Sequence, residues 1–189
     1  RIMAAADIRI PGVHNIENYM AAACAVEGLA TEEDIDAIAR TFAGVEHRIE
    51  FVRELDGVKY YNDSIASSPS RTIAGLHSFH QKLVLIAGGY DKKIPFDVLG
   101  PEICAHVRLL ILCGATAEKI EAAVKSAPNY LNGQPEILHA QTLEEAVRLA
   151  KQYTVPGDIV TLSPACAAFD QFKNFMVRGE TYKTLVQGL

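Results

Sequence analysis

The sequence predicts an α/β protein with an open, mostly parallel sheet, helices on both faces and an N-terminal β-hairpin. Three short continuous apolar runs, at residues 83–87, 109–113 and 159–162, have the composition of strands that are buried on both faces of a parallel sheet. Segments with helical periodicity separate these runs, and Asp56-Gly57 joins two further β-rich runs in the manner of a hairpin turn. Strand–helix alternation of this kind is typical of a Rossmann-like sheet that helices cover.

Two helices are expected before the sheet. Apolar side chains recur at helical spacing over residues 15–29, and Asn15 is the residue that we expect to cap this helix. A second helix is expected at residues 32–42, because Thr31 and Asp34 have the spacing of a capping box.

The domain boundary is predicted at Gly44, which ends the second helix. We therefore expect a short helical domain at residues 1–44 and a larger α/β domain at residues 45–189. The first residue is Arg1, and the opening of the chain forms no folding unit of its own, so we expect the chain to begin inside a larger protein.

The larger domain is expected to open with strands at residues 49–55 and 58–62. Helices are expected between and after the buried strands, with Pro101 splitting one of them and one or two helices at residues 164–187 closing the chain. The intervening helical patterns lie at residues 69–79, 95–105, 116–126 and 142–152.

Polar loops follow three of the strands. Because crossovers between parallel strands are right-handed, the loops that leave the carboxyl ends of the strands lie at one edge, where such sheets bind ligands. Gly88-Gly89 allows close backbone approach, and Lys92 beyond it offers a cation for a carboxylate or a phosphate, although a solvated turn explains the same residues. The three loops lie at residues 61–69, 88–93 and 163–175.

Ser68-Pro69 and Ser163-Pro164 each have the pattern of an N-cap followed by a helix-starting proline. The N–H groups at such helix starts favour anions, and simple helix capping is the alternative interpretation. Asp63 follows a strand and suits a ribose hydroxyl or a metal ion, with a turn as the alternative interpretation. Arg48 suits a phosphate or a ribose, with a surface ion pair as the alternative interpretation.

Composition excludes several classes of function. The net charge of −5 argues against a nucleic-acid surface or an anionic membrane surface, which needs a basic stripe. No apolar run has the length of a membrane span, and neither GxxxxGK[ST] nor GxGxxG occurs. We therefore expect a protein of the cytoplasm that binds neither nucleic acid nor membrane.

The cysteines and histidines are not expected to bind metal. None of the cysteines has zinc-ligand spacing, and we expect reduced core thiols, with Cys166 a buried thiol rather than a nucleophile. The histidines are interpreted as scattered and incidental, so no metal site is predicted. The residues concerned are Cys24, Cys104, Cys113, Cys166, His77, His80, His106 and His139.

Several segments in the order of the chain resemble the Mur ligases of peptidoglycan synthesis. The first is His14-Asn15-x-x-Asn18, which resembles a segment late in the family's central ATP-binding domain, and residues 44–48 resemble the entry to its C-terminal domain. Asn62-Asp63-Ser64, Gly88-Gly89-x-x-Lys92 and the long stretch at residues 163–179 follow. That last stretch resembles the D-glutamate-adding branch in particular.

The resemblance implies an ATP-dependent ligase. In this family, ATP phosphorylates the carboxylate of UDP-N-acetylmuramoyl-L-alanine, and the amine of D-glutamate attacks the acyl phosphate while Mg²⁺ neutralises charge. The implied cofactors are ATP and Mg²⁺, and the implied partners are these small molecules, with the protein a monomer. The family's phosphate-binding loop lies upstream of the segments matched here, so we expect these 189 residues to be inactive alone and predict no catalytic residue among them.

The resemblance also assigns site residues. D-glutamate would be bound by Lys92, Ser67, Phe175 and Ala168, with Lys92 pairing a carboxylate. ATP would be contacted by Asn15, Asn18, Arg48 and Asp63, the two asparagines reading adenine from one face of a helix.

The chain departs from the family pattern at three positions of this site. Ile65 stands where the family commonly has Lys, Ser67 where it has Thr, and Ala168 where it often has Ser. We expect Lys93 or N–H groups of a helix start at residues 163–166 to compensate.

Two alternatives remain open. One is a non-catalytic α/β ligand-binding module, in which Asp63 and Lys92 face solvent far apart. The other is a related amide ligase such as a folylpolyglutamate synthase, against which the stretch at residues 163–179 argues.

Overall fold

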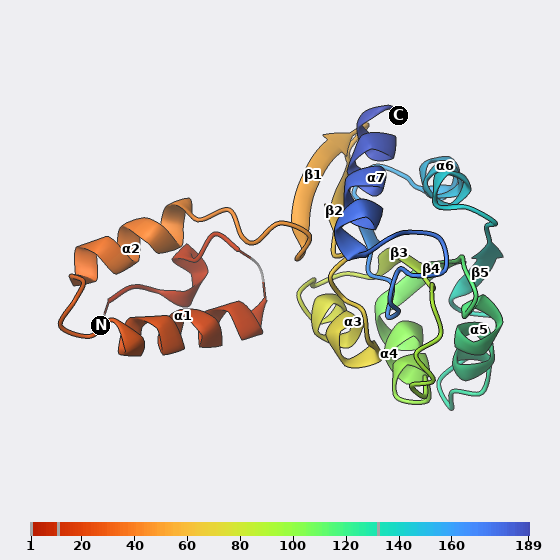
Figure 1. Cartoon of the computed structure of the whole chain (residues 1–189), viewed down its shortest axis with the longest axis horizontal. Coiled ribbons are helices and arrows are strands. Elements are labelled where there is room, and N and C mark those ends of the chain that lie inside the picture. Colours follow the sequence, from red (N-terminus) through yellow and green to blue (C-terminus); the bar gives the residue numbers. More distant parts are fainter. Residues whose placement is uncertain (1, 11, 132) are drawn as a thin grey trace. The chain divides into compact units, whose positions relative to one another are not determined.

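The structure, a computed structural model, describes residues 2–10, 12–131 and 133–189. The chain divides into two compact units, residues 1–45 and residues 46–189 (Figure 1). Among the described residues, no helix is both long enough and apolar enough to span a membrane.

The smaller unit contains a short 3₁₀ helix, η1 (Ala5–Asp7), and two α-helices, α1 (Val13–Ala25) and α2 (Glu32–Thr41). The hydroxyl of Thr31 accepts from the N–H of Asp34, and the Asp34 carboxylate accepts from the N–H of Thr31. The predicted capping box of α2 is therefore confirmed.

Two predictions for the smaller unit are wrong. Asn15 does not cap α1, because the helix starts earlier and its N-cap is Gly12, whose φ of 104° suits glycine. Cys24 is exposed rather than a core thiol, because it lies on a helix face that nothing in its own unit covers, whereas Cys104, Cys113 and Cys166 are buried.

The described part of the larger unit holds a six-stranded sheet in the order β1-β2-β6-β3-β4-β5. The pairing of β1 with β2 is antiparallel, and every other pairing is parallel. This confirms the predicted mostly parallel sheet. The strands are β1 (Glu50–Leu55), β2 (Val58–Asn62), β3 (Leu83–Ala87), β4 (Val107–Leu112), β5 (Glu136–His139) and β6 (Ile159–Leu162).

The β1–β2 hairpin forms at the predicted turn. Asp56 and Gly57 have φ angles of 53° and 77°, so both central residues are left-handed, as a tight two-residue hairpin requires. β3 and β6 also occupy the predicted residues, whereas β4 begins at Val107 and ends at Leu112.

Helices cover both faces of the sheet, as predicted (Figure 1). The helices α3, α4 and α5 lie on one face, and α6 and α7 lie on the other. Their bounds are Pro69–Leu76 for α3, Leu99–His106 for α4, Ala117–Lys125 for α5, Leu143–Tyr153 for α6 and Phe175–Gln187 for α7.

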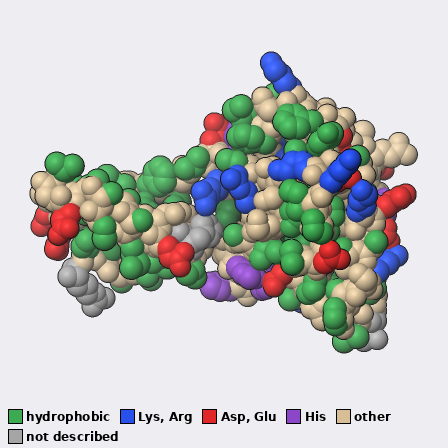
Figure 2. All heavy atoms as spheres, turned by 60° about the horizontal axis from the view of Figure 1, so that its bottom comes forward, with side chains coloured by type: hydrophobic (Ala, Val, Ile, Leu, Met, Phe, Trp, Pro, Cys, Tyr) green, Lys and Arg blue, Asp and Glu red, His purple; other side chains and the backbone are tan. Residues whose placement is uncertain are grey.

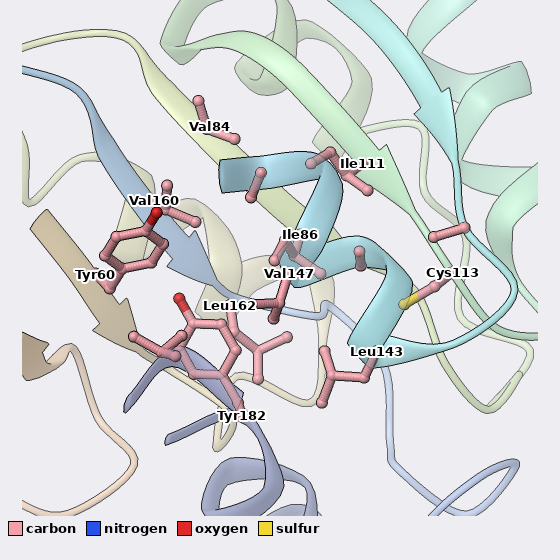
Figure 3. Packing of buried hydrophobic residues seen from close by; sticks show 14 of the residues in the cluster. Tyr60, Val84, Ile86, Ile111, Cys113, Leu143, Val147, Val160, Leu162 and Tyr182 are labelled. Atoms are coloured by element: carbon pink, nitrogen blue, oxygen red, sulfur yellow. The ribbon is translucent and has the colours of Figure 1, made fainter. Parts of the chain in front are cut away.

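Each face has its own core because successive side chains of a strand point to opposite faces. In β3, Val84 and Ile86 join the core under α6 and α7, while Leu83 and Leu85 join the core under α3, α4 and α5. Figure 3 shows the first of these cores, with Tyr182 of α7 beside the strands. Burial on both faces explains why the β3 sequence is continuously apolar.

Two predictions for the larger unit are wrong, and one of its strands was not predicted. Pro101 does not split a helix. The helix α4 begins only at Leu99, so Pro101 lies in its first turn, where the backbone N–H groups have no partner within the helix and a proline therefore costs no hydrogen bond. Ser163-Pro164 does not start a helix: residues 163–174 are irregular, and the closing helix α7 begins at Phe175. The half-exposed strand β5 was not predicted, since its four residues lack a buried apolar run.

Candidate functional site

Four loops leave the carboxyl ends of the neighbouring strands β2, β6, β3 and β4. We call these loops the rim; they comprise residues 63–68, 163–174, 88–93 and 113–116. Hydrogen bonds join each loop to the next, so the prediction that polar loops distant in the sequence meet at one edge is confirmed.

The first link joins the loops after β2 and β6 through Asp63. Its carboxylate accepts a hydrogen bond from the Ser163 hydroxyl at 2.7 Å and another from the N–H of Ile49 at 3.3 Å. Ser163 Oγ also lies 3.1 Å from the hydroxyl of Thr72 on α3. These groups are buried, so the cluster fixes where β2 ends relative to β6 and α3.

Burial is the main influence on Asp63. It raises the pKa of this carboxyl to about 7, against the opposing effects of the Ser163 and Ile49 hydrogen bonds and of the Arg48 and Arg71 charges. Asp63 therefore exchanges a proton near neutral pH.

The loops after β3 and β6 are joined through their backbones. The N–H of Gly88 donates to the carbonyl of Pro164, and the N–H of Tyr90 donates to the carbonyl of Ala167, both at 2.9 Å. The loop after β4 joins them in turn, because the N–H of Gly89 donates to the Thr116 hydroxyl at 3.1 Å. The rim is thus one hydrogen-bonded assembly.

Glycine at positions 88 and 89 is required by the neighbouring loops. Gly88 has a φ of 112°, and a Cβ there would lie 1.9 Å from the carbonyl oxygen of Cys113. Gly89 has a φ of 148°, and a Cβ there would lie 2.5 Å from the carbonyl oxygen of Ala167. The close approach predicted for Gly88-Gly89 is therefore to the protein's own backbone.

Arg178 of α7, which contacts two loops of the rim, was not predicted from the sequence. Its guanidinium donates to the Ser64 hydroxyl at 3.0 Å and the Ser64 carbonyl at 2.9 Å. It also donates to the carbonyls of Cys166 at 3.0 Å and Ala167 at 3.2 Å. The only signal in the sequence was its place in the long stretch at residues 163–179.

The Arg178 charge is buried, and no carboxylate among the described residues forms an ion pair with it. Its four acceptors are three carbonyls and a hydroxyl, and burial lowers its pKa to about 10. A fork of fixed N–H groups suits several acceptors at once, which a lysine ammonium cannot match. Arg178 therefore holds the loops after β2 and β6 against α7.

The residues assigned to the amino-acid site all lie on the rim or at its border. Lys92 is exposed, and no described residue accepts a hydrogen bond from its ammonium or forms an ion pair with it. Ser67 is half-buried. Phe175, the first residue of α7, packs edge-on against His47 with ring centroids 5.8 Å apart, and Ala168 is buried at 1% exposure.

The compensation expected for Ile65 has one surviving candidate. The helix start predicted at residues 163–166 is absent, so it offers no aligned N–H groups. Lys93 is exposed and has a left-handed φ of 58°, with its N–H donating to the Asp91 carboxylate at 2.7 Å. Lys93 also lines a surface hollow of about 610 Å³ between its loop and α5, in which Lys119 pairs with Asp91.

The residues assigned to ATP fall in both units. In the larger unit, Arg48 is exposed and Asp63 is buried. In the smaller unit, the Asn18 amide donates to Asn15 Oδ1 at 3.4 Å, so the two asparagines share one face of α1, as their spacing predicts.

Cys166 is a core thiol, as expected. It is 2% exposed, its sulfur lies 3.1 Å from the Thr116 hydroxyl, and burial raises its pKa to about 11. A thiol with such a pKa is a poor nucleophile at neutral pH.

Two groups of histidine and glutamate side chains have ligand atoms within 4.8 Å of one another in the described residues, and neither includes a residue of the rim. One is Glu46, His47 and Glu180; the other is His77, Glu102 and His106. The interpretation of the histidines as scattered is therefore wrong for His77, which directly follows α3, and for His106, the last residue of α4; they meet through the packing of these two helices.

Comparison with known proteins gives close relatives over the whole chain. The UDP-N-acetylmuramoylalanine–D-glutamate ligase of Acetivibrio thermocellus is 53% identical over 190 residues, covering 100% of this chain and 41% of that protein. The ligase of the same name from Clostridium beijerinckii is 54% identical over 183 residues, covering 97% of this chain and 40% of that protein. The chain thus spans about 40% of the length of these curated relatives.

Solved structures share the fold at much lower identity. MurF from Acinetobacter baumannii superimposes with a TM-score of 0.66 at 16% identity, covering 94% of this chain and 38% of that one. Folylpolyglutamate synthase from Mycobacterium tuberculosis, complexed with ADP, gives 0.64 at 14% identity, covering 93% of this chain and 41% of that one.

A family model described as "Mur ligase, glutamate ligase domain" matches residues 47–166, more than half of the chain. With this match, the close relatives and the shared fold, the chain belongs to the Mur ligase family and contains its glutamate ligase domain.

Proposed function

We propose that the chain is the C-terminal part of a ligase that uses ATP to join D-glutamate to UDP-N-acetylmuramoyl-L-alanine. The observation that carries this proposal is the identity of about half of all residues, over the whole chain, with ligases of that name. The folylpolyglutamate synthases share the fold at 14% identity in the M. tuberculosis example, which supports only a distant relation.

The D-glutamate site in this proposal lies at the rim around Lys92. A dicarboxylate needs a cation, and Lys92 is an exposed rim lysine without a partner among the described residues. A charge-assisted hydrogen bond to one carboxylate contributes about 1.5–3 kcal/mol. The Ser67 hydroxyl would donate to the ligand, Phe175 would supply an apolar wall, and the buried Ala168 would leave space where a larger side chain would intrude.

The ATP contacts in this proposal come from both units. Arg48 is exposed and offers a guanidinium to a phosphate. Asp63 accepts two hydrogen bonds within the protein, and a carboxylate can accept about four, so acceptor capacity remains for a ribose hydroxyl. Asn15 and Asn18 would contact adenine.

The rim residues do not fit a magnesium site of their own. Each of the three carboxylates of the rim already has a partner within the protein: Asp63 with Ser163, Asp91 with Lys119, and Asp170 with the N–H of Ala115. Mg²⁺ prefers several oxygen ligands in an octahedron. We therefore assign no Mg²⁺ ligand to these residues.

The decisive experiment is a ligation assay with the 189 residues joined to the upstream residues of the full-length protein. We expect ATP-dependent phosphate release with UDP-N-acetylmuramoyl-L-alanine and D-glutamate, and much less with L-glutamate or with a folate as acceptor. Release with a folate and L-glutamate instead would identify the alternative ligase. The 189 residues alone, which contain no GxxxxGK[ST] segment, are expected to release no phosphate.

Lys92 is tested in the same full-length protein. Lys92→Ala is expected to raise the KM for D-glutamate about tenfold or more, because a charge-assisted hydrogen bond is lost. Lys125→Ala is the control, since Lys125 is also exposed but pairs with Glu121 on α5. Lys93→Ala tests the second cation. An unchanged KM in Lys92→Ala would remove this residue from the site.

We also propose that the protein is a monomer of the cytoplasm, where ATP and nucleotide-linked substrates are available. Light scattering during gel filtration tests the monomer, and a dimer mass at micromolar concentration would contradict it.

A further inference from the structure

The cluster of His77, Glu102 and His106 lies outside the rim and joins two helices. His77 follows the last residue of α3, and Glu102 and His106 stand four residues apart on α4. Both imidazoles approach the same carboxylate oxygen, with Nε2 of His77 at 2.6 Å and Nε2 of His106 at 3.6 Å from Glu102 Oε2. Figure 2 shows histidine side chains gathered on the surface of the larger unit.

We propose that His77, Glu102 and His106 form a surface site for a divalent transition-metal ion of the zinc type. Two imidazole nitrogens and one carboxylate oxygen are a donor set that suits Zn²⁺, whereas Mg²⁺ prefers oxygen ligands alone. The site is independent of the proposed ligase reaction and of the Mg²⁺ that the reaction implies.

The geometry needs little adjustment to hold such an ion. Ligands at about 2.0–2.2 Å from a tetrahedral zinc lie roughly 3.3–3.6 Å from one another. The ligand atoms of the three side chains already lie within 4.8 Å of one another. The 2.6 Å contact between His77 and Glu102 would open by less than about 1 Å, which rotation of partly exposed side chains supplies.

The partial exposure of these side chains leaves a fourth position for water. The exposed fractions are 52% for His77, 34% for Glu102 and 33% for His106. An ion here would tie the C-terminal end of α3 to α4, two helices that pack against each other. Because α3 begins directly after the rim residue Ser68, the ion would stabilise the helix that supports the rim.

A simple histidine–carboxylate pair elsewhere in the chain provides the matched control. His139 lies 2.7 Å from Glu121, a distance like that of His77 from Glu102, but its third neighbour is Lys125 rather than a second imidazole. A cationic ammonium disfavours a metal ion, so this pair should not bind one.

The test is isothermal titration of the chain with ZnCl₂ in a Cys24→Ser background, which removes the exposed thiol as a competing ligand. We expect one zinc ion per chain, because in the Glu46–His47–Glu180 group both carboxylates already pair with the Lys183 ammonium. The zinc affinity should weaken about tenfold or more in His77→Ala and in His106→Ala and stay unchanged in His139→Ala. A hundredfold excess of MgCl₂ should not displace the ion.

A thermal measurement distinguishes lost binding from lost folding. At one zinc concentration, Zn²⁺ should raise the Tm of the unsubstituted chain by several degrees and raise the Tm of His77→Ala and His106→Ala by clearly less, while circular dichroism without metal confirms that each variant is folded. Equal zinc affinity in all the variants, or displacement by Mg²⁺, would overturn the proposal. If a variant does not fold, His77→Gln and His106→Gln, which preserve polarity at these exposed positions, take its place.

Discussion

At the scale of single residues, a buried carboxyl, that of Asp63, and a buried guanidinium, that of Arg178, hold the loops of the rim together by hydrogen bonds. Asp63 is ionisable near neutral pH because burial dominates its environment, and Arg178 keeps its charge because its fork meets three carbonyls and a hydroxyl. Neither role follows from the local sequence, because desolvation depends on atoms that the fold brings from other elements.

The raised pKa of Asp63 predicts how the free energy of unfolding varies with pH. Its pKa is about 7 in the folded chain and near its ordinary value of 3.8 when unfolded. Between these values the folded state binds the extra proton, so this stabilising contribution is complete below about pH 4 and is lost as pH rises towards 7. The free energy of unfolding should therefore fall, by at most about 1.4 kcal/mol per pH unit from this group.

Asp63→Asn should remove that decline. Urea unfolding at pH 4.5, 5.5, 6.5 and 7.5 measures this decline as the difference in the free energy of unfolding between the unsubstituted chain and the variant. Asp97→Asn, at an exposed position, should follow the unsubstituted chain throughout. A difference that stays constant over this range would show that Asp63 does not titrate there.

The hydrogen bonds of Arg178 predict that even a substitution by lysine lowers the free energy of unfolding substantially. Arg178→Lys keeps the charge but cannot reach all four acceptors, so buried carbonyls lose their donors and the free energy of unfolding should drop by about 2 kcal/mol or more. Denaturant unfolding measures the change. Arg148→Lys, on the exposed face of α6, should stay within about 0.5 kcal/mol, and equal effects at both positions would refute the role of Arg178.

At the scale of elements, the ends of the strands are positioned by backbone contacts between loops. Local pattern correctly located β3 and β6, because an apolar run of strand length between turns is a local signal. It failed at Ser163-Pro164, whose capping pattern is overridden because the backbone of residues 164–167 bonds instead to Gly88, Tyr90 and Arg178. The half-exposed edge strand β5 gave no comparable signal.

The contact between the β3 and β4 loops predicts a difference between two glycines. Gly88 and Gly157 both have positive φ, 112° and 98°, so alanine strains the backbone at each by about 1–2 kcal/mol. Only at Gly88 would the new Cβ meet another backbone, the Cys113 carbonyl at 1.9 Å; at Gly157 nothing lies within 4 Å. Gly88→Ala should therefore destabilise the chain by at least about 2 kcal/mol more than Gly157→Ala. Thermal unfolding measures both, and similar costs would contradict the close contact.

At the scale of the whole molecule, stability is concentrated in the larger unit. Every residue of the two hydrophobic cores lies between Val58 and Val186, whereas the described residues of the smaller unit contain one buried hydrophobic residue, Ala39. A segment that buries so little apolar surface cannot offset its conformational entropy.

Residues 46–189 should therefore fold without the smaller unit. We expect this segment to unfold in a single cooperative thermal transition by circular dichroism, and a separate peptide of residues 1–45 to show no such transition. A segment 46–189 without a cooperative transition would show that the larger unit needs residues 1–45.

The sequence by itself determined the order and type of most elements, the tight hairpin at Asp56-Gly57, and the resemblance to the Mur ligases, because periodicity, turn chemistry and motifs are local properties of the chain. Only the tertiary structure decided that Arg178 binds two rim loops, that Asp63 is buried, and that His77 and His106 share one carboxylate. The physical reason is that burial and hydrogen bonding between distant segments depend on packing, which residue spacing along the chain does not encode.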